Sequence, residues 1–89
     1  MMQGKGTEII QNGHKYVGDF WGDKYDGKGV LTWPNGEIGE KYEGEFWNGH
    51  MHGKGVYFFS SGKKFVGEFD YGEFIEGHYH YEDGRIEEY

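Results

Sequence analysis

The sequence contains no cysteine and a single proline among its 89 residues. Without cysteine, neither disulfide bonds nor thiolate metal sites can stabilise the chain, and this usage is the one expected of a cytoplasmic protein. No apolar run is long enough for a membrane-spanning helix, and the first residues lack the apolar core of a signal peptide. Basic residues are scarce as well, with 9 Lys and Arg against 16 Asp and Glu and a net charge of −7. This balance excludes nucleic acid as an expected partner and disfavours membrane lipid.

Glycine and aromatic residues are abundant instead, with 18 glycines and an aromatic content of 20%. Both values lie far above ordinary usage. The short length limits the chain to one small domain, 1–89, which buries only a modest share of its surface. Bulky rings alternating with glycine indicate a sheet in which glycine makes room for a neighbouring ring.

A five-residue pattern of an aromatic residue, any residue, glycine, an acid and Phe occurs three times. Its copies begin at Tyr16, Tyr42 and Phe65, which are 26 and 23 residues apart, and Tyr89 follows 24 residues later. A fixed period in this range is typical of repeat arrays, whose units bury their apolar faces against their neighbours.

Each copy is followed by a second half with a glycine, an alternating segment and a closing glycine. The two glycines are always seven residues apart, at 29 and 36, 55 and 62, and 77 and 84. An unpaired second half with the same spacing, Gly6 to Gly13, precedes the first full unit. The sequence therefore divides into a half-unit, 4–15, and three repeats, 16–41, 42–64 and 65–88.

The alternation within each pattern predicts β-strands. Tyr16, Gly18 and Phe20 share one face at a period of two, while Val17 and Asp19 take the other face. Asn-Gly and Asp-Gly pairs between the segments are typical of tight turns. We expect an all-β chain of seven to eight short antiparallel strands, with one face aromatic and the other largely acidic.

Two irregularities interrupt the repeats. Five residues, 37–41, separate Gly36 from Tyr42, so we expect this junction to bulge. The third unit lacks one residue between Gly72 and Gly77, and Ile75 replaces the first glycine of its glycine pair, so we expect its hairpin turn to differ from the others.

These residues resemble the MORN (membrane occupation and recognition nexus) repeat. The middle unit carries the family pattern from Tyr42-Glu43-Gly44-Glu45-Phe46 through His52-Gly53-Lys54-Gly55 to Gly62. Unit one departs at Asp26, where the family has His, and unit three departs at Ile75. The resemblance implies an elongated single-layer antiparallel sheet of stacked β-hairpins, whose rings line a curved inner face. It implies that the stacking rings are Tyr16, Phe20, Trp33, Tyr42, Phe46, Phe59, Phe65, Phe69 and Tyr81.

The same resemblance implies no single activity, because the repeats of this family occur within membrane tethers, lipid kinases and cytoskeletal scaffolds. We expect a non-enzymatic module that binds a protein, peptide or helix in the aromatic-lined groove and also forms a homodimer. Trp21 and Trp47 occupy equivalent sites on the acidic face and are predicted to form a second contact surface. The alternative is a peripheral module that binds membrane lipid or phosphoinositide.

Catalytic and metal-binding patterns are weak. Paired carboxylates such as Glu43 and Glu45 lie on the outward face, and the only serines, Ser60 and Ser61, have no activating base. Four histidines allow a metal hypothesis if stacking brings two pairs together, His50 with His52 and His78 with His80. The simpler interpretation is that they are exposed strand and turn residues. We therefore expect no enzyme, no cofactor and no metal site.

Overall fold

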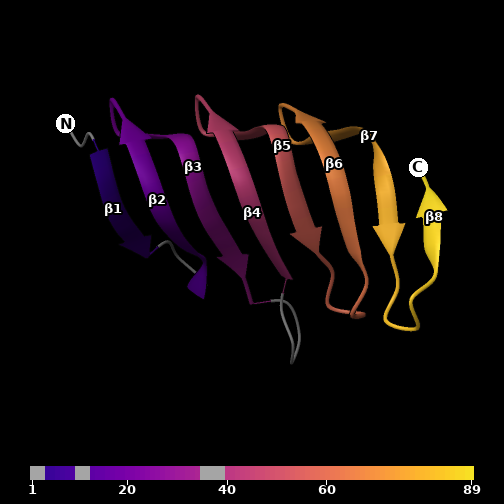
Figure 1. The fold of residues 1–89 in the computed structure, drawn as a ribbon. Coiled ribbons are helices and arrows are strands. Elements are labelled where there is room, and N and C mark those ends of the chain that lie inside the picture. Colours follow the sequence, from indigo (N-terminus) through magenta and orange to yellow (C-terminus); the bar gives the residue numbers. More distant parts are fainter. Residues whose placement is uncertain (1–3, 10–12, 35–39) are drawn as a thin grey trace.

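The computed structural model describes residues 4–9, 13–34 and 40–89 of the chain. Eight antiparallel strands form one open sheet in chain order, and the two ends of the chain lie at opposite ends of it (Figure 1). The strands are β1 (Gly4–Ile9), β2 (Lys15–Trp21), β3 (Lys24–Trp33), β4 (Glu40–Trp47), β5 (His50–Phe58), β6 (Lys64–Asp70), β7 (Glu73–His80) and β8 (Ile86–Glu88).

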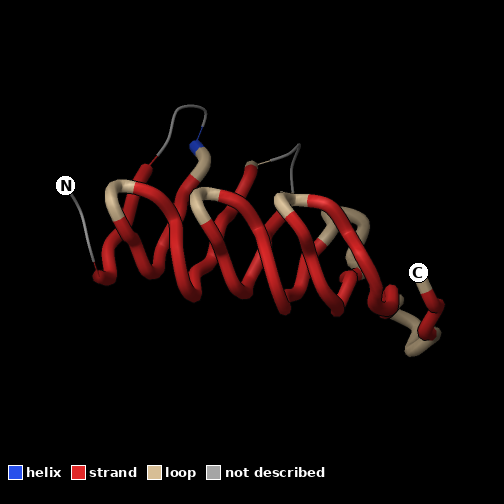
Figure 2. Tube along the Cα trace, turned by 90° about the horizontal axis from the view of Figure 1, so that it is seen from above, coloured by secondary structure: helices blue, strands red, loops and turns tan. Residues whose placement is uncertain are grey.

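The predicted all-β single-layer sheet of hairpins is confirmed, and the described residues contain no α-helix. The molecule is elongated, with extents of 43 × 28 × 16 Å. Seen from above, the strands curve, and the chain winds through the sheet as a row of similar loops (Figure 2). The expected bulge at 37–41 falls mostly on residues 37–39, which lie outside the described part of the chain.

A row of seven glycines crosses the sheet from β1 to β7, each directly opposite the next. The row consists of Gly6, Gly18, Gly29, Gly44, Gly55, Gly67 and Gly77. Aromatic rings pack closely against this row. A methyl group at Gly29 would therefore overlap the Tyr16 ring, and one at Gly55 would overlap the Tyr42 ring. The regular glycines of the sequence therefore provide the space for the rings of the preceding strand.

The core consists of the six predicted rings at the start and end of each pattern. They are buried at 0–4% exposure: Tyr16, Phe20, Tyr42, Phe46, Phe65 and Phe69. Each pair within a strand meets edge to face, at centroid distances of 5.1 Å for Tyr16–Phe20 and 5.5 Å for Phe65–Phe69. This geometry is the favourable one for aromatic pairs.

A second layer of partly buried side chains covers the core rings. Trp33 and Phe59 belong to this layer, as predicted. It also contains four rings that were not predicted from the sequence: Tyr25, Tyr57, Phe74 and Tyr79. Tyr25 stacks on Tyr16 at 3.8 Å and Phe74 stacks on Phe65 at 4.3 Å. The prediction of Tyr81 as a stacking ring was wrong. Because β7 ends at His80, Tyr81 lies in the following turn, outside the core cluster.

Tyr89 does not repeat the role of Tyr16, although the spacing placed it at the start of a further unit. Glu87 lies opposite Tyr79, and the Tyr89 N–H donates to the Gly77 carbonyl at 3.0 Å. Tyr89 therefore continues the glycine row, and its ring contacts those of Phe65, Phe74 and Tyr79.

The three hairpin turns beside the repeated pattern are alike. Their two central residues are Gly22-Asp23, Asn48-Gly49 and Tyr71-Gly72, and all six have positive φ angles between 49° and 88°. Two consecutive positive φ angles define the type I′ turn, which matches the twist of the flanking strands. The expectation that the third turn would differ was therefore wrong.

The missing residue of the third unit instead shortens a β-bulge. Between Gly18 and Phe20, one residue of β2 faces three residues of β3, and the β4–β5 pair repeats this arrangement. In the β6–β7 pair the shift falls between Glu68 and Phe69, and only Ile75 is extra. The shorter bulge absorbs the deletion, so the turn keeps its form.

Candidate functional site

The sheet is hollowed on the face opposite the aromatic core. This hollow has a volume of about 1320 Å³ and is lined by the glycine row together with valine and charged side chains. The hollow is not the predicted aromatic-lined groove, because the six core rings are buried on the other face and Tyr89 is the one aromatic ring of Phe, Tyr or Trp among the described residues that line it. The physical reason is that rings fill one face, whereas glycine and valine leave space on the other.

One row of side chains across the hollow is mainly apolar. Its members face one another from β2 to β8 and are Val17, Val30, Glu43, Val56, Val66, His78 and Glu88. Four valines in seven positions give the hollow an apolar floor, in which Val17 is 44% exposed and the other three are partly buried. In the sequence each of these valines stands next to a glycine of the glycine row, but alternation alone does not show which face is hollow.

A second row carries alternating charge. Lys5 lies opposite Asp19, Lys28 opposite Glu45 and Lys54 opposite Glu68. The Lys5 ammonium forms an ion pair with Asp19 at 3.0 Å. The alternation ends at β7, where Glu68 lies opposite Glu76. Like charges directly opposite each other are unfavourable, so this end of the hollow favours a positive ligand group.

The acids of the repeated pattern also stabilise the bulges. Asp19 Oδ2 accepts the N–H of Lys28 at 3.0 Å, and Glu45 Oε1 accepts the N–H of Lys54 at 2.7 Å. The Lys28 hydrogen bond, followed by that of Lys5, holds the pKa of Asp19 below its usual value. These two acids are therefore engaged with the backbone and are not a free acid–base pair.

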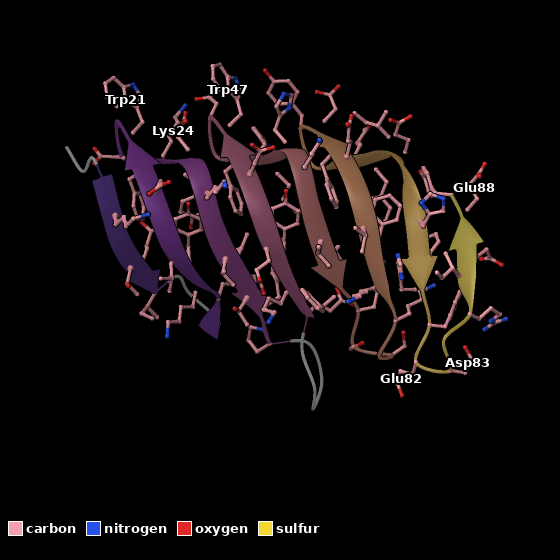
Figure 3. The ribbon with its side chains drawn as sticks, viewed as in Figure 1. Trp21, Lys24, Trp47, Glu82, Asp83 and Glu88 are labelled. Carbon is pink, nitrogen blue, oxygen red and sulfur yellow. The ribbon has the colours of Figure 1, made fainter. Side chains whose placement is uncertain are left out.

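Trp21 and Trp47 lie beside the hairpin turns, at one edge of the sheet (Figure 3). Their side chains are 66% and 52% exposed. Neither lines the hollow, so the two tryptophans form an edge separate from it. The two tryptophans hold equivalent positions, as predicted, because each pairs with the first residue of the following strand. Trp21 lies opposite Lys24 and Trp47 opposite His50.

The histidine pairs do not converge. His50 and His52 lie at the β4–β5 turn, where the His52 Nδ1 atom is 3.3 Å from Asp70 Oδ1. His78 lines the hollow and His80 ends β7 opposite Lys64. Among residues 4–9, 13–34 and 40–89, no three His, Cys, Asp or Glu side chains are grouped to hold a metal ion.

A comparison with known protein families identifies the family of this chain. The MORN repeat family model matches residues 1–15, 16–38 and 42–64, which make up more than half of the chain. The chain belongs to the MORN repeat family. None of the curated proteins compared with it matches. The third hairpin, β6–β7, lies outside the matched segments but keeps the glycine row and the buried rings of this MORN repeat protein.

MORN repeats are non-enzymatic modules that generally interact with proteins or membranes. In the part of this chain that the structure describes, no helix is long and apolar enough to cross a membrane. The surface features that the fold offers are the valine row, the charged row and the exposed tryptophans.

Proposed function

We propose that this MORN repeat protein binds a segment of a partner protein in the hollow face of its sheet. The observation that supports the proposal is the hollow itself, about 1320 Å³ in volume and crossed by a row of four valines that are at least partly exposed. A partly exposed apolar surface of this kind, flanked by charged side chains, is typical of an interaction site.

The charge of the hollow defines the chemistry of the segment. Five of its lining residues are acids and two are lysines; the acids are Glu43, Glu45, Glu68, Glu76 and Glu88, and the lysines are Lys28 and Lys54. We infer that the segment is basic and partly apolar, with its positive groups beside Glu68 and Glu76. The same acidity argues against anionic lipid, because basic residues supply the attraction of a protein to such membranes.

Peptide display tests this function. A library of twelve-residue random peptides is selected on the protein, and dissociation constants of the enriched peptides are measured by isothermal titration calorimetry. We expect basic, partly apolar peptides whose affinity falls at least tenfold with Val56→Arg and at least fivefold with Glu68→Lys. Lys24→Ala, beside the first turn, is the matched control and leaves the affinity unchanged.

Two outcomes contradict the proposal. One is the enrichment of peptides that bind the two hollow variants as tightly as the original protein. The other is salt-sensitive co-sedimentation with anionic vesicles in the absence of peptide binding, which would support the lipid alternative. Thermal unfolding by circular dichroism verifies that each variant is folded.

Two further contacts belong to the proposal. Trp21 and Trp47 provide a second contact edge, supported by their exposure beside the turns. Self-association uses the edge strand β1, where the described chain is paired on one side only, with β2. An edge strand presents unpaired N–H and C=O groups that a second strand can satisfy.

A further inference from the structure

Three aromatic rings surround the ammonium group of Lys63 at the edge of the sheet where β5 meets β6. The Lys63 Nζ atom lies 5.1 Å from the ring centroid of Phe59, 4.6 Å from that of Tyr79 and 5.6 Å from that of Tyr81. All three distances are within the range of about 6 Å at which a cation interacts favourably with an aromatic ring.

Tyr79 belongs to β7, and the other two rings, Phe59 and Tyr81, come from two turns that have the same sequence pattern and the same hydrogen bonds. Each turn runs from an aromatic residue to a cation, Phe59 to Lys63 and Tyr81 to Arg85. The Phe59 N–H donates to the Lys63 carbonyl at 3.0 Å, and the Tyr81 N–H donates to the Arg85 carbonyl at 2.9 Å. Because both turns are fixed in this way, Phe59 and Tyr81 flank Tyr79 in a preformed arrangement.

Aromatic rings, rather than a carboxylate, hold the Lys63 side chain. Among the described residues, the ion pairs of lysine involve Lys5 and Lys41 and not Lys63. A flexible lysine stem with a strongly hydrated ammonium group gains little from such a site and can leave it. A trimethylammonium group is larger and less hydrated, and aromatic cages are the sites that recognise such groups.

We propose that Phe59, Tyr79 and Tyr81 form a binding site for the trimethylammonium group of a trimethylated lysine, which Lys63 closes in the free protein. The acids near the cage favour a methylated peptide over a choline lipid, because Glu82 contacts the Gly62 turn and the Tyr81 hydroxyl donates to Glu87. Their negative charge repels the phosphate of a choline headgroup and attracts a basic peptide. Glu82 and Asp83 lie at the edge opposite Trp21 and Trp47 (Figure 3).

This site is independent of the proposed function. Tyr79 and Phe59 pack against the aromatic core, on the face opposite the hollow, and neither lines the hollow. A variant that weakens peptide binding in the hollow, such as Glu68→Lys, therefore leaves the cage intact. Failure of one proposal is distinguishable from failure of the other.

The test is an NMR titration of the ¹⁵N-labelled protein with three probes. They are Nα-acetyl-trimethyllysine amide, Nα-acetyl-lysine amide and vesicles of phosphatidylcholine. We expect the trimethyllysine probe to shift the amide signals of residues 59–63 and 79–85 at millimolar concentration. We expect it to bind at least fivefold more tightly than the lysine probe, and at least fivefold more tightly again in Lys63→Ala, where no lysine ammonium competes for the three rings.

Variants decide the outcome. Lys64→Ala, whose ammonium lies over Phe58 and not in the cage, is the matched control and keeps the affinity of the original protein. Tyr81→Ala, which removes a ring outside the folding core, reduces the affinity at least fivefold. If Lys63→Ala fails to fold, Lys63→Gln replaces it.

Three results overturn the proposal. They are the absence of any shift in the Lys63 variant, equal affinity for the methylated and unmethylated probes, and an affinity that Tyr81→Ala leaves unchanged. Binding to phosphatidylcholine vesicles without binding to the trimethyllysine probe overturns the choice of ligand.

Discussion

At the scale of single residues, glycine and tyrosine of the repeat are complementary in shape. The Tyr42 ring lies against Gly55 of the next strand, and its hydroxyl donates to the Glu45 carbonyl at 2.9 Å. Tyr16 makes the equivalent hydrogen bond to the Asp19 carbonyl at 2.7 Å. Phe65 has no hydroxyl to make this bond, and its unit is the one with the shorter bulge. The tyrosine that begins the pattern thus contacts the glycine row through its ring and the bulge through its hydroxyl.

Substitution of Gly55 by alanine tests this complementarity. The added methyl group overlaps the Tyr42 ring and the strand has no room to move, so we expect a loss of about 1–3 kcal/mol in the free energy of unfolding. Urea denaturation followed by circular dichroism measures it. Gly72→Asn is the control, because its side chain enters open space and asparagine tolerates positive φ. Equal stability of the two variants would contradict the role of the glycine row.

Alkaline pH tests the burial of the same tyrosines. Burial, with the charges of Asp19 and Asp26, raises the pKa of Tyr16 from 10.0 to about 12, and burial also raises the pKa of Tyr42. A raised pKa means that the folded state holds the proton more tightly, so stability is fully present below pH 10 and is lost as the pH rises toward 12. We expect the melting temperature to fall across this interval. Tyr16→Phe flattens the decrease, whereas Tyr71→Phe, at an exposed turn, does not change it.

At the scale of the strand pair, the bulge explains why the acid and the glycine pair recur together. The Glu45 carboxylate contacts Gly53 and accepts the N–H of Lys54, which the bulge leaves without its regular partner. Asp19 does the same for Gly27 and Lys28. Gly53 has a φ of +86°, so the bulge also requires glycine for its backbone conformation.

Replacement of Glu45 by alanine removes the acceptor from the bulge. We expect a loss of about 1 kcal/mol in the free energy of unfolding, since the N–H of Lys54 loses its hydrogen bond at a site that water can reach. Chemical denaturation measures the loss, and amide hydrogen exchange locates it at Lys54. Glu43→Ala, on the same strand, is the matched control, because the Glu43 carboxylate pairs with the exposed Lys41 ammonium at 3.2 Å. Slow exchange at Lys54 in the Glu45 variant would refute the interpretation.

At the scale of the whole molecule, the described residues form one open sheet, and its two outermost strands are each paired on one side only. The edge strand β1 is exposed along most of its length. Pairing between two copies would satisfy its free backbone groups and enlarge a small core. The elongated shape leaves both the hollow and the cage accessible in such a dimer, because neither includes β1.

Light scattering coupled to size exclusion tests self-association. We expect the mass to rise from 10.3 kDa toward twice that value as the concentration increases to the high micromolar range. Thr7→Pro removes a backbone donor from β1 and is expected to restore the monomer, whereas Glu73→Gln, at the β6–β7 turn, has no effect. A monomeric mass of the original protein at the highest concentration would exclude self-association by this edge.

The sequence by itself determined the repeat, a sheet of seven to eight strands and the faces on which the six buried rings lie. These follow from local rules, since alternation of side chains assigns residues to two faces and Asn-Gly sets a turn. The glycine row was implied by the fixed spacing of the pattern. Family membership followed from the same residues, because the pattern combines several rings and glycines in one register.

Only the tertiary structure decided which face is hollow, where the third unit absorbs its deletion and which rings meet Lys63. Alternation assigns a side chain to a face but not the curvature of the sheet, which depends on the bulges and on how rings fill one side. The position of Tyr81 depends on where β7 ends, and the site combines Phe59 and Lys63 with Tyr79 and Tyr81, which lie 16 or more residues further along the chain. Such contacts arise between neighbouring hairpins, and no local pattern specifies them.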